Sequence, residues 1–554
     1  MAEKRIFSRS RRFYILSGTL LLIIIGGFIF WTIFKYKLVN KKLDKLVTEK
    51  SKGLYQVTYD HLFIDEALGD LSVENVTMVP DSLVYLSQVR QQTAPDNLFF
   101  IHIPKLIITG VKTPKALLNK EISGHIVRIQ NAAIEIRLGK TDKKKKTGIL
   151  KQMGPDIYQQ LLGNLKSINA DSVILENASL ILRDNQSKSI RCKATGLSFR
   201  FAGIAIDSLK QDDSTSILFS KELAIHCDQL ELPTKTKVYS LEVSGFDLSS
   251  VTGNIHTNQI KLIPHLSETA FSRSYKYAKD RFNIRIGSMD IRHLDRQAYL
   301  QEQLVAESIE IRNASFLIFR DKSIPHDSVD RTRDYPQDAI RRLPFPVSIK
   351  KIYVKDSYIE YKEKNEKSDS SGKVAFFHVQ AVFENVTNMP THIRQNNLMR
   401  LHFESAFLNE AHFKADIKMP LNDREGKFQL DASLGPINAS SLNPLVKPMA
   451  LAELKKGKIN GLRYHLDATH TKGKGRLTLT YEGLSIKLLK KDDDKNKYKT
   501  KVLPTLAAGF LLKDSNPTDG KLRIGTVDYN RDIHRSIFNL MWKSLFSGIK
   551  QVAL

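Results

Sequence analysis

The chain lacks the residues and motifs on which most enzyme families depend. Its 554 residues include only two cysteines, Cys192 and Cys227, which are too few for a disulfide framework. The sequence is compatible with one bridge and equally with two buried free thiols. No HExxH, GxSxG, Walker A, GxGxxG or paired CxxC motif occurs. We therefore expect no catalytic residues, no metal site and no cofactor, and predict that the protein is not an enzyme.

Acidic residues are also scarce relative to basic ones. The formal net charge is +26, which favours anionic partners such as nucleic acid or a bilayer rich in acidic lipid. No recognised nucleic-acid module or interleaving of Arg with aromatic residues accompanies the charge, so we expect no nucleic-acid binding. Because 42% of the residues are hydrophobic, a disordered chain is also excluded.

One apolar run indicates the compartment. Residues 13–34 carry no charged side chain, and as a helix they would extend about 33 Å, enough to cross a bilayer. Basic residues within 1–12 favour a cytoplasmic N-terminus, although lysines also follow the run. The sequence thus predicts a basic cytoplasmic tail over 1–12, a transmembrane signal anchor over 13–34 and a helical neck over 35–53. The bulk of this single-pass protein is expected outside the cytoplasm.

The remaining sequence is dominated by alternating apolar residues, the pattern of strands with one buried face. The alternation repeatedly runs up to an Asn and resumes in the opposite phase. In VILENASLILRD, Leu175 precedes Asn177, and Leu180 and Leu182 follow it. One extra residue in a strand turns all the following side chains to the other face of the sheet, unless a β-bulge accommodates that residue. The pattern predicts such bulges at Asn75, Asn131, Asn177, Asn313, Asp356 and Asn385.

A longer repeat and a proline-containing segment predict the domain organisation. Residues 106–136 resemble 289–319, each with a strand, a short helical piece and an Asn cassette, as in stacked repetitive proteins. The polar segment 322–346 contains four prolines and is interpreted as a linker or long loop. It divides a repetitive β-sheet region over 54–321 from a second β region over 347–489.

The C-terminal part of the chain is expected to contain a charged loop and extension over 490–530 and an amphipathic helix over 531–554. This helix could touch a membrane or cap the last edge of the sheet, and we favour capping because exposed sheet edges need cover. Its candidate contact residues are Ile537, Met541, Trp542, Leu545 and Phe546.

A sheet that is apolar on one face for hundreds of residues must cover that face. A second sheet would produce a sandwich, whereas a bent sheet would produce an apolar groove able to shelter acyl chains. The expected fold is mostly β, with an elongated, bent, repetitive sheet that forms such a groove after the transmembrane helix. Short helices and the C-terminal helix complete this architecture. The candidate residues of the lipid groove are Ile134, Ile136, Leu180, Leu182, Phe316 and Ile318.

The combination of basic tail, single anchor and repeated strands resembles the AsmA-type proteins of bacterial envelopes, which are related to TamB. The segment 455–489 is similar to the C-terminal AsmA region, in which a glycine-containing element leads into a hairpin. The cassettes at Asn131, Asn177, Asn313 and Asp356 resemble the repeated strands of the family. The tail sequence IFNLMWKSLFSGIKQ is similar to that of large envelope proteins of Bacteroidota.

This resemblance implies an inner-membrane anchor, a periplasmic β groove and a role in phospholipid traffic or outer-membrane homeostasis. The expected partners are therefore phospholipid or another acyl-chain lipid, and the inner membrane through the N-terminal helix. The alternative is a non-enzymatic β-sandwich scaffold or interaction protein of the cell envelope. The lipid conduit and the scaffold would differ in their interior. In a sandwich, side chains fill the interior, whereas in a conduit an open apolar trough remains.

Overall fold

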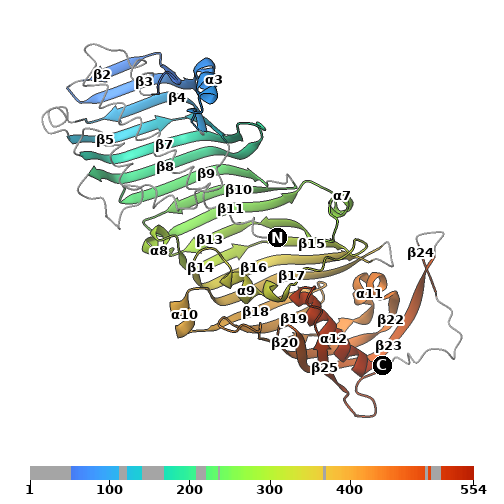
Figure 1. The fold of residues 1–554 in the computed structure, drawn as a ribbon. Coiled ribbons are helices and arrows are strands. Elements are labelled where there is room, and N and C mark those ends of the chain that lie inside the picture. Colours follow the sequence, from blue (N-terminus) through green and yellow to red (C-terminus); the bar gives the residue numbers. More distant parts are fainter. Residues whose placement is uncertain are drawn as a thin grey trace. The chain divides into compact units, whose positions relative to one another are not determined.

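The computed structural model describes residues 51–65, 67–95, 97–111, 121–139, 167–207, 220–234, 238–365, 370–492, 497–500 and 513–553. This part of the chain is mostly β, with short helices and one longer C-terminal helix, which confirms the expected class (Figure 1). The predicted anchor and most of the predicted neck lie outside the described residues. The chain divides into two compact units, and each contains antiparallel and parallel strand pairs.

Unit 1 comprises residues 1–235 and 241–258. Its only described helix is α3 (Ser82–Arg90). The side chain of Asp81 accepts hydrogen bonds from the backbone N–H groups of Leu83 and Val84 and so caps the first turn of this helix. The elements of this unit are β1 (Tyr55–Thr58), β2 (Leu62–Asp65), β3 (Asp70–Pro80), α3 (Ser82–Arg90), β4 (Asn97–Thr109), β5 (Glu121–Gln130), β6 (Ala133–Leu138), β7 (Ser167–Asp184), β8 (Ile190–Asp207) and β9 (Glu222–Pro233). The division between the units runs through β10 (Tyr239–Ser249) and β11 (Asn254–Pro264).

Unit 2 comprises residues 236–240 and 259–554. Its first elements are α7 (Glu268–Arg273), β12 (Arg281–Ile286), β13 (Ser288–Arg292), α8 (Arg296–Leu300), β14 (Leu304–Arg312), β15 (Ser315–Asp321), η2 (Thr332–Asp334), α9 (Pro336–Arg341), β16 (Val347–Lys364), β17 (Ser371–Thr387) and α10 (Pro390–Gln395). They are followed by β18 (Leu398–Phe407), β19 (Ala411–Pro420), β20 (Phe428–Leu434), β21 (Ile437–Asn438), η3 (Ala439–Leu442), α11 (Asn443–Ala450), β22 (Ala452–Ala468), β23 (Lys472–Asp492), β24 (Lys497–Thr500), β25 (Ile524–Asn530) and α12 (Ile537–Ala553).

In each unit most strand pairs are antiparallel, but one strand pairs in parallel with two others. In unit 1, β5 and β6 follow one another along the chain and both pair in parallel with β7. In unit 2, β14 and β15 pair with β16 in the same way. The segment 322–346, interpreted from sequence as a linker, is the connection between the parallel strands β15 and β16, and it carries η2 and α9. A parallel pair requires such a long crossover, because the chain must return to the starting end of the sheet.

The structural similarity between the two repeats extends beyond the segments 106–136 and 289–319 that the sequence pattern identified. In both copies two successive strands pair in parallel with a third, β5 and β6 with β7 and β14 and β15 with β16, and this third strand is followed by a partner of nearly equal length, β8 or β17. The hydroxyl of Tyr55 accepts a hydrogen bond from the backbone N–H of Phe99 at 3.2 Å. The hydroxyl of Tyr239 accepts one from the N–H of Phe282 at 3.1 Å. The same tyrosine contact therefore recurs at the start of the second repeat.

The main hydrophobic core of unit 2 lies between the sheet and the helical segments near the C-terminus. Buried side chains of β16 to β25 pack there with Tyr335, just before α9, and with Ile537, Leu540 and Val552 of α12. Most of the segment 455–489 forms an antiparallel hairpin of β22 and β23, with Tyr464 paired to Leu477. The region predicted as a charged loop and extension contains two further strands, β24 and β25, and both pair with β23.

Candidate functional site: the apolar face of the sheet

The strands of unit 1 keep their apolar side chains on one face in spite of the phase change in the sequence. In β7, Val173 and Leu175 are 3% and 1% exposed, and after the phase change Leu180 and Leu182 are 2% and 3% exposed. Asn177 between them is exposed and has φ of 51°. The pairing register with β8 shifts at this point. The extra residue is thus absorbed as a bulge, and all four apolar side chains share one face, called here the apolar face.

All six positions predicted from the cassettes have a left-handed backbone, with φ between 45° and 58°. Asn is suited to this conformation because its short polar side chain can bond locally. The side-chain amide of Asn75 donates to Asp60 at 2.7 Å, and that of Asn385 donates to the carbonyl of Asn396 at 2.8 Å. The cassette therefore has a conformational function in the strands.

The bulges of unit 1 lie side by side on neighbouring strands. The side-chain amide of Asn177 donates to the side-chain oxygen of Asn131 at 2.8 Å, and the backbone N–H of Asn131 donates to the carbonyl of Glu176 at 2.9 Å. On the other side, the backbone N–H of Asn177 donates to the hydroxyl of Ser198 at 3.0 Å. The next strand, β8, has its own left-handed residue at Gly196, with φ of 61°. A row of bulges therefore crosses the sheet from β5 to β8.

Unit 2 repeats this row. The backbone N–H of Asn313 donates to the carbonyl of Lys355 at 3.1 Å, next to Asp356. The side chain of Gln380 donates to the carboxylate of Asp356 at 3.1 Å, and the adjacent strand is left-handed at His378, with φ of 50°. Sequence reasoning missed His378 and Gly196, although in both strands the apolar alternation changes phase at that residue.

The predicted groove residues form one patch in each unit. Ile134 pairs with Leu180 and Ile136 with Leu182 in the parallel register, so the four side chains are adjacent on the apolar face of unit 1. All four are at most 3% exposed. In unit 2, Phe316 is adjacent to Ile284 and Ile359, and Ile318 is adjacent to Phe282 and Tyr361.

The apolar face of unit 2 is covered unevenly. Phe316, Ile318, Ile284 and Ile359 are each only partly buried, whereas the side chains near α9 and α12 are nearly inaccessible. The described helices α9, α11 and α12 thus protect part of this face and leave the patch around Phe316 accessible. An apolar surface that remains accessible is free to take up an apolar ligand.

An aromatic cluster extends the patch across the sheet. The ring of Phe376 lies 5.7 Å from Phe403, 5.5 Å from Phe407 and 5.4 Å from Phe413, measured between ring centroids. All four side chains are partly buried. These residues were not singled out from sequence, although Phe403 and Phe407 stand at even spacing in β18, as residues on one face must.

The predicted contact residues of the C-terminal helix divide between its two sides. Ile537 is 7% exposed and packs into the core, and Met541 and Leu545 pack against the same core from partly buried positions. Trp542 and Phe546 are 44% and 38% exposed on the opposite side. Figure 1 shows α12 lying over β23 and β25, which it contacts.

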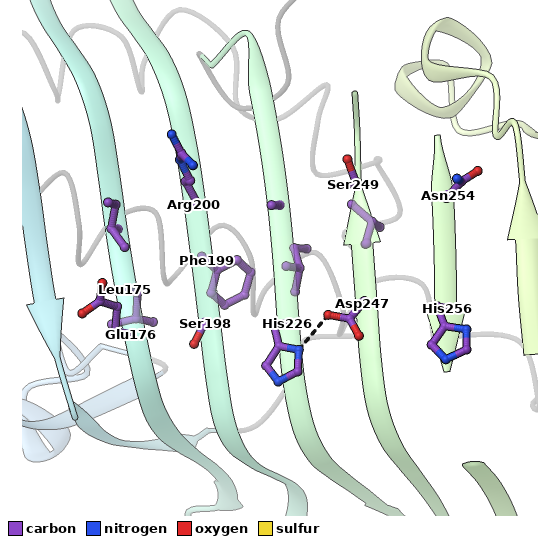
Figure 2. Close-up of a pocket in the computed structure, with 14 residues that line it drawn as sticks. Leu175, Glu176, Ser198, Phe199, Arg200, His226, Asp247, Ser249, Asn254 and His256 are labelled. Atoms are coloured by element: carbon purple, nitrogen blue, oxygen red, sulfur yellow. Dashed lines mark hydrogen bonds and ion pairs between the residues drawn. The ribbon is translucent and has the colours of Figure 1, made fainter. Parts of the chain in front are cut away.

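A hollow of about 400 Å³ lies in unit 1, and its lining combines apolar side chains such as Leu175 and Phe199 with polar ones. As Figure 2 shows, it is lined by His226, Asp247 and His256 from three strands. The ring of His226 bonds to Asp247 at 2.7 Å and to Asp228 at 3.0 Å. These carboxylates, Asp247 foremost, raise the pKa of His226 because they stabilise its protonated form. The hollow is open to solvent, so its polar groups interact in water.

Similar His–carboxylate pairs recur on other strands, at His402 with Asp416 and at His465 with Asp431. This recurrence is typical of cross-strand pairing on a solvated face. Within the described ranges, no three His, Cys, Asp or Glu side chains are placed to hold one metal ion. The two cysteines are free and buried, which resolves the alternative left open by the sequence. Burial raises the pKa of Cys192 to about 12.

No known protein family matches the sequence, and no curated protein matches it. Among the helices that the structure describes, none combines the length and apolar character needed to cross a bilayer. The apolar run at 13–34, from which an anchor was predicted, falls outside those residues.

Proposed function

We propose that this protein is a non-enzymatic, membrane-anchored carrier that holds or conducts phospholipid on the apolar face of its sheet. The observation that carries the proposal is the accessible apolar patch around Phe316, on a face that the bulges keep continuous along each strand. The likeness to AsmA-type and TamB-related envelope proteins supports the same function. In this proposal the protein is anchored in the inner membrane, with its N-terminus cytoplasmic and its sheet in the periplasm as an elongated, bent groove.

The proposed mechanism is passive. Burying an acyl chain gains about 0.8 kcal/mol per CH₂ group, so a dry apolar surface can hold a lipid tail without specific polar contacts. Side chains such as Phe316 and Ile318 would contact the tail, and the headgroup would stay in water. Movement along the face would need no chemical step, because the tail would contact apolar side chains only.

A photo-crosslinking experiment on the full chain tests this proposal. A benzophenone amino acid replaces Phe316 or its partner Ile284 on the partly accessible patch, and cells are labelled with radioactive phosphate before irradiation. Matched controls place the same group at Leu317 or Arg285, the next residue of the same strand, which points to the opposite face. A labelled lipid adduct at Phe316 and Ile284 but not at the controls is expected. Equal labelling at all four positions, or none at any, would refute lipid binding by this face.

The second candidate, a scaffold or interaction protein, is favoured by one observation. In the C-terminal part of unit 2, side chains of the sheet and of α12 fill the interior, with Leu466, Leu477 and Leu540 all inaccessible to solvent. Such a filled interior is what an ordinary structural module would have. If the crosslinks give no lipid but recover one defined envelope protein, the scaffold function replaces the lipid carrier.

A further inference from the structure

The outer side of α12 carries an aromatic stripe with no packing partner in the core. Phe538 is 75% exposed, Trp542 44% and Phe546 38%. The spacing of four residues places the three on one side of the helix. The rings of Trp542 and Phe546 stack, with centroids 6.4 Å apart. Among the described residues, only two other aromatic side chains are comparably exposed, Phe63 and Tyr277, so exposed aromatic surface is concentrated on this helix.

The opposite side of α12 is fixed firmly to the sheet. Leu540, Ser544 and Val552 are fully buried. The helix approaches β25 so closely that a Cβ atom added to Gly525 would lie 2.4 Å from the carbonyl oxygen of Gly548. The helix therefore cannot turn its aromatic stripe inward without leaving the sheet. The stripe is a permanent outer surface of this unit.

The helix that carries the stripe has charges of one sign only. The helix contains Lys543 and Lys550 and no acidic residue, and the ammonium group of Lys550 lies 5.0 Å from the centre of the Phe546 ring. Asn539 and Lys543 also line a hollow of about 570 Å³ beside the helix. Its other charged or titratable side chains are Arg320, Lys322, His326, Tyr529, Asp532 and Arg535. Carboxylates pair with three of these cations, Arg320, Lys322 and Arg535, so the positive charge beside the stripe is supplied by the lysines of the helix itself.

We propose that α12 docks on the surface of an anionic lipid bilayer. Aromatic side chains that lie beside lysines are suited to the boundary between headgroups and acyl chains, where the rings enter the apolar layer and the ammonium groups contact phosphates. The net charge of +26 attracts the whole chain to such a surface. This docking is independent of the proposed lipid cargo, because the residues that carry it face away from the apolar face of the sheet.

The chain offers a direct optical probe of this contact. It has two tryptophans, Trp31 and Trp542, so the W31F variant of the full chain reports on Trp542 alone. This protein is held in neutral phosphatidylcholine nanodiscs and mixed with vesicles whose lipids carry brominated acyl chains, which quench tryptophan on contact. We expect quenching and a blue shift with vesicles containing phosphatidylglycerol, and little change with purely neutral vesicles.

Three variants on the W31F background separate docking from folding. Lys543→Glu with Lys550→Glu should weaken binding at least about 30-fold, since each lysine near an anionic surface contributes about fivefold. Phe538→Ser with Phe546→Ser should abolish quenching, while Phe63→Ser, an exposed aromatic of unit 1, should leave it unchanged. Unaltered circular dichroism shows that each variant is folded. Absence of quenching by anionic vesicles, equal quenching by neutral ones, or full binding by the Phe538/Phe546 variant would overturn the proposal.

Discussion

The left-handed bulge at Asn177 gives a sharp test of how the sheet keeps one apolar face. Its backbone has φ of 51°, a conformation that costs a residue with a Cβ atom roughly 1–2 kcal/mol and a β-branched residue most. Its side-chain amide also donates the 2.8 Å hydrogen bond to Asn131, which contributes about 0.5–1.5 kcal/mol net. Asn177→Val loses both contributions, so we expect local destabilisation of roughly 2–3 kcal/mol.

Asn177→Gly separates the two contributions. Glycine adopts positive φ without strain, so this variant loses only the side-chain hydrogen bond and should be destabilised by about 1 kcal/mol or less. The matched control is Asn169→Val in the same strand, β7, where the residue is exposed and does not have a positive φ. Valine is favourable in an ordinary strand position. This control is therefore expected to be neutral or slightly stabilising.

Hydrogen exchange followed by mass spectrometry measures the effect where it occurs. A loss of roughly 2–3 kcal/mol increases local opening about 30- to 150-fold, which should appear in peptides of β7 and β8 of Asn177→Val. Peptides of β16 in unit 2 are the internal reference. If Asn177→Val exchanges no faster than Asn169→Val, or if Asn177→Gly is as damaging as Asn177→Val, the bulge does not depend on the left-handed backbone and this reasoning is wrong.

Three further predictions concern other parts of the molecule. Gly525→Ala should release α12 from the sheet, because the added Cβ atom would lie 2.4 Å from the carbonyl oxygen of Gly548. Limited proteolysis of this variant should then cleave α12 first. If α12 stays resistant to the protease, the close contact is contradicted. The hydrogen bond to Asp431 raises the pKa of His465 in the folded state, so its stabilising contribution is complete below roughly pH 6.5 and is lost as pH rises through the raised pKa. Thermal unfolding of His465→Gln should therefore depend less on pH than that of the wild type, and parallel curves would exclude this linkage. Both free thiols are buried, and burial raises the pKa of Cys192 to about 12. They should therefore react with a thiol reagent only after the protein unfolds. Rapid reaction of the native protein would show that the thiols are accessible.

The sequence anticipated the bulges better than it anticipated the pairing. A phase change at Asn131 or Asn177 is a local signal, because it depends on the period of the strand and on the tolerance of Asn for positive φ. The bulge at His378 was missed because no Asn or Asp marks the phase change there, and those were the residues by which the cassettes were found. Strand β25 was missed because its seven residues lie between charged segments, and it is held by β23, which lies well before it in the chain.

The sequence by itself determined that the protein is mostly β, that its strands have one apolar face, and where the six left-handed residues of the cassettes interrupt them. These properties follow from local alternation and from the conformational preferences of single residues. Only the tertiary structure decided which strands lie parallel, that the bulges of neighbouring strands form a row, and which part of the apolar face α12 covers. The physical reason is that alternation with a period of two is the same for either pairing direction. Burial, in contrast, depends on contacts such as that between Gly525 and Gly548, which exist only after distant segments have packed together.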